Sequence, residues 1–151
     1  MSIAERVEHD LVTALRARDE TRLATLRLLK AAAKNAEVAK RSPLTEEEYE
    51  AIVRRQVKMR REAASEYDRG HRPQQADQER RELVILEEYL PPQLDEATLR
   101  QVVAQAVDET GATSLGELGK VMSHAMRSVQ GRADGNQVNQ IARALLSERA
   151  G

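Results

Sequence analysis

Few side chains in this sequence have the type and spacing that catalysis requires. The three histidines, His9, His71 and His124, lie far apart, and no His-Glu-x-x-His zinc pattern is present. Cysteine is absent, which excludes a thiolate nucleophile, a thiolate metal site and a disulfide framework. Residues 116–120, GELGK, resemble a phosphate-binding loop only superficially, because the glycines are three apart and no Ser or Thr follows the lysine. We therefore expect no independent catalysis, no metal and no cofactor.

Clusters of basic residues are the stronger chemical signal. Residues 16–41 contain eight basic residues against three acidic ones, and residues 54–61 read RRQVKMRR, with five basic residues and no acid. Within that run, Arg54, Lys58 and Arg61 have the i, i+4, i+7 spacing of one helix face. Such a face attracts a polyanion, or it is a solvated surface whose cations pair with nearby carboxylates. These residues alone leave both interpretations open.

The last third of the sequence contains a second basic cluster. Lys120, His124 and Arg127 again have the spacing of one helix face, and Arg132 follows in the segment 131–135, GRADG. This segment precedes an expected helix, whose first backbone N–H groups favour a phosphate oxygen. The alternative is a tight turn in which the glycines supply left-handed backbone and the aspartate caps the next helix. The candidate contacts to an RNA backbone are Lys120, His124, Arg127, Arg132, Asn136, Asn139, Arg54, Lys58 and Arg61.

Composition narrows the class of partner. The 151 residues include 24 Lys and Arg against 25 Asp and Glu, a formal net charge of −1, which argues against indiscriminate coating of nucleic acid. The only aromatic residues are three tyrosines, so we expect neither a base-stacking surface nor DNA specificity. No segment has the pattern of a membrane-spanning helix or a signal peptide. We therefore expect a cytoplasmic protein without a membrane partner.

Helix-forming residues dominate throughout, and no segment alternates in the manner of a strand, so we expect an all-α fold. Start signals are clearest at Asp19, at Thr45, where Glu48 completes a capping box, and at Asp95. In the third helix, one face would carry Ile52, Met59, Ala63 and Tyr67. The expected helices cover about 2–17, 20–40, 45–69, 74–90, 96–110, 114–129 and 135–148.

Two consecutive prolines, Pro91 and Pro92, predict a break in the helical pattern and a domain boundary near residue 93. Residues 1–93 would form a long-helix hairpin domain, and residues 94–151 a small three-helix bundle. The first part carries 18 basic and 18 acidic residues, and the second carries six and seven. About 58 residues can bury only a marginal core, so the second domain would be modestly stable.

Three segments resemble the GatB/YqeY family, and specifically its small stand-alone YqeY-like proteins. They are LEEYLPPQL at 86–94, LGKVM at 118–122, and GRADG followed by Val138 and Asn139. The order of these motifs, the chain length and the basic N-terminal helices are also similar to that family, over nearly the whole chain. The resemblance implies a two-domain, all-α fold.

The resemblance also implies that residues 94–151 are similar to the tail of the B subunit of the glutamine-dependent aspartyl/glutamyl-tRNA amidotransferase. In that enzyme the tail contacts tRNA, while other parts carry out the chemistry. If the matching positions have the same roles as in that tail, the glycines would serve helix packing and turns, and the basic residues would face RNA. The positions that match the tail are Gly119, Lys120, Gly131, Arg132, Ala133, Asp134 and Gly135, and the structural motif residues are Gly119, Gly131, Asp134, Gly135, Pro91 and Pro92.

This chain contains neither the catalytic cradle nor the amidase of that enzyme. We therefore expect a non-catalytic, tRNA-associated module that binds the RNA backbone through a basic helix face and the GRADG loop. One alternative is a protein–protein adaptor for an amidotransferase or another translation-related protein. A second alternative is an amidotransferase-type component, a carbon–nitrogen ligase with glutamine as amido donor, that acts with a partner.

Overall fold

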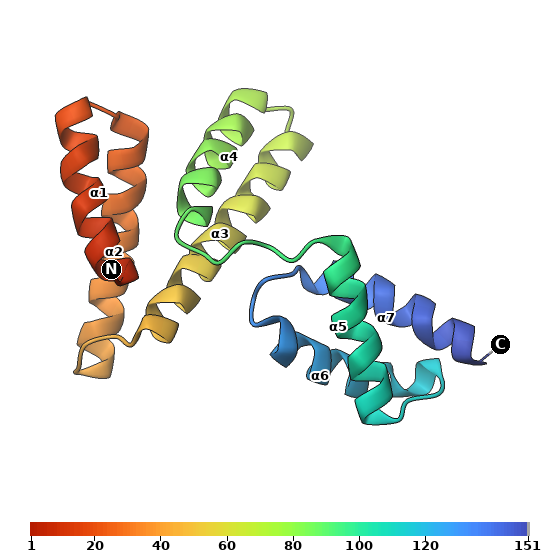
Figure 1. The fold of residues 1–151 in the computed structure, drawn as a ribbon. Coiled ribbons are helices and arrows are strands. Elements are labelled where there is room, and N and C mark those ends of the chain that lie inside the picture. Colours follow the sequence, from red (N-terminus) through yellow and green to blue (C-terminus); the bar gives the residue numbers. More distant parts are fainter. Residues whose placement is uncertain (151) are drawn as a thin grey trace. The chain divides into compact units, whose positions relative to one another are not determined.

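The computed structural model describes residues 1–150, and all regular structure in this part of the chain is helical (Figure 1). The all-α prediction is therefore confirmed. The chain divides into two compact units, Met1–Leu90 and Pro91–Gly151, and the predicted boundary at 93 falls in the non-helical segment between them. The elements are α1 (Ile3–Ala17), α2 (Glu20–Lys40), α3 (Glu46–Arg69), α4 (Pro73–Glu87), α5 (Glu96–Thr110), the short 3-10 helix η1 (Leu115–Glu117), α6 (Leu118–Val129) and α7 (Gly135–Ala150).

Side-chain caps fix where most of these helices begin. Asp19 accepts a hydrogen bond from the backbone N–H of Arg22 at 3.1 Å, and Asp95 accepts one from Thr98 at 2.7 Å. At the start of α3, Thr45 and Glu48 form the reciprocal capping box that the sequence predicts. Each side chain satisfies a backbone donor that has no partner within the helix.

The helix predicted from residue 114 begins differently. Residues 115–117 form a 3-10 turn, and the α-helix starts only at Leu118. The carboxylate of Glu117 accepts the backbone N–H of Thr113 at 2.6 Å, which closes a separate turn before the helix. The hydrophobic pattern did not reveal this start because Leu115 and Leu118 fit either kind of helix.

The first unit consists of two helical hairpins, α1–α2 and α3–α4 (Figure 1). Their apolar faces meet in one core, in which Val7, Leu26, Leu29, Val53 and Leu86 are fully buried. The burial of these aliphatic side chains is the main favourable contribution to the stability of the unit, at about 25 cal/mol per Å² of apolar surface.

The buried face of α3 differs from the face that the sequence analysis chose. Met59 is 50% exposed, and Ile52, Ala63 and Tyr67 are only partly buried. The side chains that face the core are Tyr49, Val53, Val57, Arg60 and Ala64. The choice was wrong because one member of the true face is an arginine, which a search for apolar residues passes over.

Arg60 is 8% exposed and contributes to the packing of α3 against α4. Its Nε lies 3.6 Å from the carboxylate of Glu82, and its Nη1 donates to Gln56 at 3.4 Å. Burial, together with the nearby charge of Glu82, raises the pKa of Glu79 on the same helix as Glu82. Arg60 therefore serves as the internal counter-charge of the α3–α4 hairpin.

The second unit packs α5, α6 and α7 around its own core. The buried side chains that these three helices contribute to the core are Leu99, Val103, Ala106, Val107, Val121, Ala125, Val129, Val138, Ile141, Ala142 and Leu146. The turn between α6 and α7 uses left-handed backbone at Gln130 and Gly131, with φ of 50° and 76°. Within residues 1–150, no helix is both long and apolar enough to cross a membrane.

Candidate nucleic-acid interface

The basic run RRQVKMRR lies in the middle of α3, where helix geometry divides it between two faces. Arg60 points inward, as described above, whereas Arg55, Lys58 and Arg61 are exposed. None of these three makes an ion pair in the described part of the chain, while Arg54 pairs with Glu50 at 2.8 Å. The helical spacing predicted a face of Arg54, Lys58 and Arg61, whereas in the structure Arg55 takes the place of the paired Arg54. We call Arg55, Lys58 and Arg61 the α3 basic face.

Most cations of the neighbouring helix α2 have partners within the first unit. Both guanidinium Nη groups of Arg22 bond to the carboxylate of Glu88, at 2.7 and 3.3 Å, and this contact raises the pKa of Arg22. Lys30 pairs with Glu8 at 2.6 Å, and Lys40 pairs with Glu48. The local excess of positive charge in residues 16–41 is therefore smaller in the folded protein than in the sequence.

The second predicted cluster lies on α6, and its three members have different surroundings. Nε2 of His124 lies 2.7 Å from the carboxylate of Glu109 on α5. Lys120 is exposed, with Glu117 at 3.7 Å. Arg127 is exposed and makes no ion pair within residues 1–150. The histidine therefore links α6 to α5, and Arg127 is the member of this face whose charge has no ion-pair partner among the described residues.

The GRADG loop leads from α6 to α7 and is hydrogen-bonded to the segment that begins the second unit. Nε of Arg132 donates to the carbonyl of Pro92 at 3.0 Å, and the carbonyl of Arg132 accepts the backbone N–H of Leu94 at 2.8 Å. The carboxylate of Asp134 accepts the backbone N–H of Asn136 at 3.4 Å. Arg132 is half-buried, so its side chain both holds the proline segment in place and presents charge at the surface.

The two asparagines of the candidate set lie on α7. Asn136 is exposed near the start of the helix, and Asn139 accepts a hydrogen bond from Nε of Arg143 at 2.8 Å. The structure gives no hydrogen bond between either asparagine and Lys120, His124 or Arg127. The candidates of the second unit are therefore distributed over α6, the loop and α7, and no hydrogen bond or ion pair among the described residues joins the three elements into one pocket.

The motif around Pro91 and Pro92 has a structural explanation in both units. On its N-terminal side, Glu88 and Tyr89 contact α1 and α2 within the first unit. On its C-terminal side, the carbonyl of Pro92 accepts the Arg132 guanidinium within the second unit. The proline pair thus ends α4 and begins the second unit, which agrees with the helix-breaking role predicted for it.

Residues 1–150 contain no group of three or more His, Asp or Glu side chains arranged to hold a metal ion. The most prominent features that remain are the α3 basic face in the first unit and the exposed cations Lys120 and Arg127 on α6 in the second. Exposed cations of this kind attract a polyanion by charge.

The chain belongs to the family described as Yqey-like protein, whose family model matches residues 4–146. It is also 26% identical over 135 residues to a protein named altered inheritance of mitochondria protein 41, mitochondrial, from Pyrenophora tritici-repentis. That similarity covers 87% of this chain and 73% of the relative. The resemblance inferred from LEEYLPPQL, LGKVM and GRADG is thereby confirmed at the level of the family.

Proposed function

We propose that this protein is a non-catalytic RNA-binding module of the cytoplasm, whose ligand is the sugar-phosphate backbone of tRNA. The observation that carries the proposal is the α3 basic face, where three exposed cations within two helical turns have no acidic partner among the described residues. The net charge of the protein is −1, so this concentration of unpaired positive charge is a property of the α3 basic face and not of the whole chain. Lys120 and Arg127 on α6 supply a second contact region, in line with the tail resemblance.

The physical basis of this binding is charge neutralisation and shape. Cations that replace the counterions of a folded RNA gain free energy from the release of those ions, so affinity falls as salt rises. Folded RNA exposes phosphates and 2′-hydroxyl groups across its wide minor groove, and these need no aromatic platform. None of Tyr49, Tyr67 or Tyr89 is among the exposed side chains, which is consistent with binding that does not depend on base stacking.

The direct test is the binding of purified full-length protein to bulk tRNA across a series of salt concentrations. One variant carries Arg55→Glu, Lys58→Glu and Arg61→Glu, and a second carries Lys120→Glu and Arg127→Glu. Arg132 is left unchanged because its guanidinium holds the Pro92 carbonyl. We expect the parent to bind with a negative slope of log affinity against log salt, and each variant to lose slope by about 0.7 to 0.9 per contact removed.

A matched control separates specific contacts from net charge. Arg16→Glu, Arg72→Glu and Arg100→Glu alter the charge by the same amount as the α3 variant, at exposed positions in α1, in the turn before α4 and in α5. The control is expected to retain most of the binding. The proposal fails if the parent does not bind tRNA at low salt, or if the control weakens binding as much as the α3 variant does.

A glutaminase assay on the same purified chain tests the amidotransferase alternative. We expect no amide hydrolysis by the protein alone, because the sequence contains no cysteine and, within residues 1–150, no serine or threonine hydroxyl donates to a histidine ring. Activity that persists through purification and is abolished by one polar substitution in this chain would replace the proposal with an enzymatic function.

A further inference from the structure

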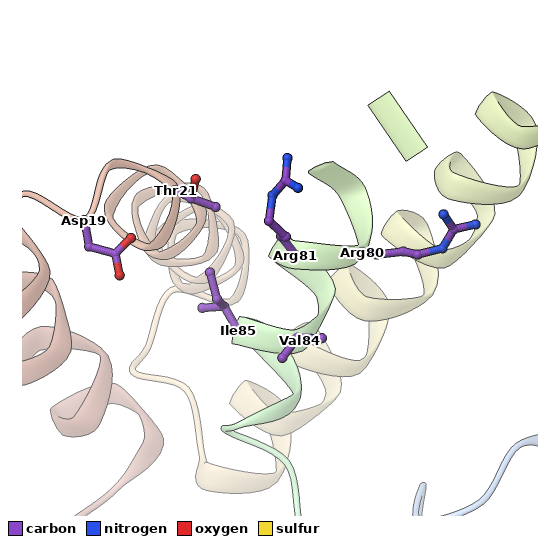
Figure 2. Close-up of a pocket in the computed structure, with 6 residues that line it drawn as sticks. All are labelled: Asp19, Thr21, Arg80, Arg81, Val84 and Ile85. Atoms are coloured by element: carbon purple, nitrogen blue, oxygen red, sulfur yellow. The ribbon is translucent and has the colours of Figure 1, made fainter. Parts of the chain in front are cut away.

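A cleft of about 520 Å³ opens in the first unit between the beginning of α2 and the middle of α4. Figure 2 shows Asp19 and Thr21 on one side, and Arg81, Val84 and Ile85 of α4 on the other, while Arg80 extends away from α2. The proposed RNA contacts do not include any of these residues. The volume lies in the range of ligand and peptide pockets rather than of packing defects.

The floor of the cleft is apolar and accessible. Ile85 is largely buried, but Val84 beside it is 60% exposed. The hydroxyl of Thr21 makes no hydrogen bond within residues 1–150. The hydrogen bond from the Thr25 hydroxyl goes to the backbone carbonyl of Thr21. An occupant would therefore gain apolar contact with the two aliphatic side chains and one hydrogen bond at the threonine.

The free charge at the cleft is positive. Asp19 is occupied as a helix cap and by Arg22, whose Nε lies 3.4 Å from it. Arg80 is compensated by Asp68 and by Asp77, the latter at 3.1 Å. Arg81, in contrast, bonds only to the neutral amide oxygen of Gln78, at 3.2 and 2.7 Å from its Nε and Nη2. One guanidinium at the edge of the apolar floor is thus left without a counter-charge.

We propose that this cleft is a docking site for an amphipathic helical segment of a partner protein, with apolar residues flanked by Asp or Glu. The apolar side chains would cover Val84 and Ile85, and an acidic side chain would pair with Arg81 in a charge-assisted hydrogen bond. A protein segment fits better than RNA, because a phosphate backbone has nothing to place on two aliphatic side chains and no aromatic residue lines the cleft for a base. This inference does not depend on the RNA proposal.

The probe is a displayed library of random helical peptides, selected on the full-length protein and counter-selected on a variant with Arg81→Glu and Val84→Asp. Both substituted side chains are exposed, so the variant is expected to fold. We expect the peptides enriched on the parent alone to combine aliphatic residues at helical spacing with an excess of Asp and Glu. Arg81→Glu alone should weaken the best peptide about tenfold.

Control variants and a map of the contact complete the test. Val38→Asp, at a valine that is 69% exposed elsewhere on α2, and Arg55→Glu on α3 should leave peptide affinity unchanged. In amide NMR spectra of the full chain, the best peptide should shift the signals of Thr21, Arg81 and Ile85. The inference is overturned if no peptide distinguishes parent from variant, if the enriched peptides are basic or lack apolar residues, or if tRNA shifts these same signals.

Discussion

The phenol hydroxyl of Tyr89 donates a hydrogen bond to the carboxylate of Asp10, 79 residues earlier in the chain. Tyr89 is only 2% exposed, and the guanidinium of Arg6 lies over its ring, 4.8 Å from the centroid. The same arginine donates to the carbonyl of Glu88 at 2.8 Å. These three interactions hold the segment that follows α4 against α1. They give a structural reason for Glu88 and Tyr89 in the LEEYLPPQL motif.

Replacement of Tyr89 by Phe removes this hydrogen bond while it keeps the ring in place. We expect the free energy of unfolding to fall by about 1.5–3 kcal/mol, the usual net value for a hydrogen bond to a charged group. Urea unfolding of the full chain measures it. A double-mutant cycle with Asp10→Asn isolates the pair, and additive effects of the two changes would show that the two side chains do not interact.

The capping box at the start of α3 predicts how stability responds to acid. The Lys40 ammonium and the backbone N–H of Thr45 lower the pKa of Glu48 from 4.5 to about 2. Because the pKa of the folded state is the lower one, this contribution to stability is present above pH 4.5 and is lost as the pH falls toward about 2. We expect thermal melting temperatures to decrease through this interval.

Glu48→Gln tests this assignment. At neutral pH the variant should be less stable than the parent, and the difference between the two should shrink as the pH approaches 2, where the parent carboxylate is protonated. Glu47→Gln is the matched control, since Glu47 lies on the same helical turn and makes no ion pair within residues 1–150. A difference that stays constant with pH would contradict the proposed origin of the shift.

The sequence predicted the helices well because their signals are local. The caps at Asp19, Thr45 and Asp95 and the breaks at the prolines depend only on neighbouring residues. The identity of the inward face of α3 depends instead on α4, since Arg60 is buried only because Glu82 lies opposite. For the same reason the sequence could not show that Arg22 is compensated by Glu88, 66 residues away, whereas Arg55 has no partner within residues 1–150.

Gly119 and Gly111 are expected to respond in opposite ways to replacement by alanine. A Cβ at Gly119 would meet no atom within 4 Å, so helix packing does not explain the glycine of the LGKVM motif. Gly119→Ala should leave stability unchanged or raise it by about 0.5 kcal/mol, because alanine favours the helix. Gly111 ends α5 with a φ of +68°, and Gly111→Ala should cost about 1 kcal/mol.

The Gly119→Ala variant also bears on function. If the backbone at Gly119 closely approaches an RNA ligand, Gly119→Ala will weaken tRNA binding while the protein remains as stable as the parent. If both binding and stability are unchanged, Gly119 lies outside the contact. Urea unfolding and the tRNA salt series measure the two quantities separately, and a loss of stability in Gly119→Ala would contradict the open surroundings seen in the structure.

Arg60 is the buried member of the RRQVKMRR run, and its replacement should affect stability differently from replacement of an exposed neighbour. Arg60→Met keeps an apolar stem against the core but leaves the carboxylates of Glu79 and Glu82 without their cation. We expect a loss of about 3 kcal/mol in the free energy of unfolding, as for other buried ion pairs that lose one partner. The loss should diminish in acid, because burial and Glu82 raise the pKa of Glu79, the charge of Arg60 opposes that rise, and its removal lets the carboxyl protonate more readily. Arg61→Met, one residue further on the exposed face, should alter stability by no more than about 0.5 kcal/mol while it weakens tRNA binding. Equal effects of the two substitutions on stability would mean that the structure divides the two faces of α3 incorrectly.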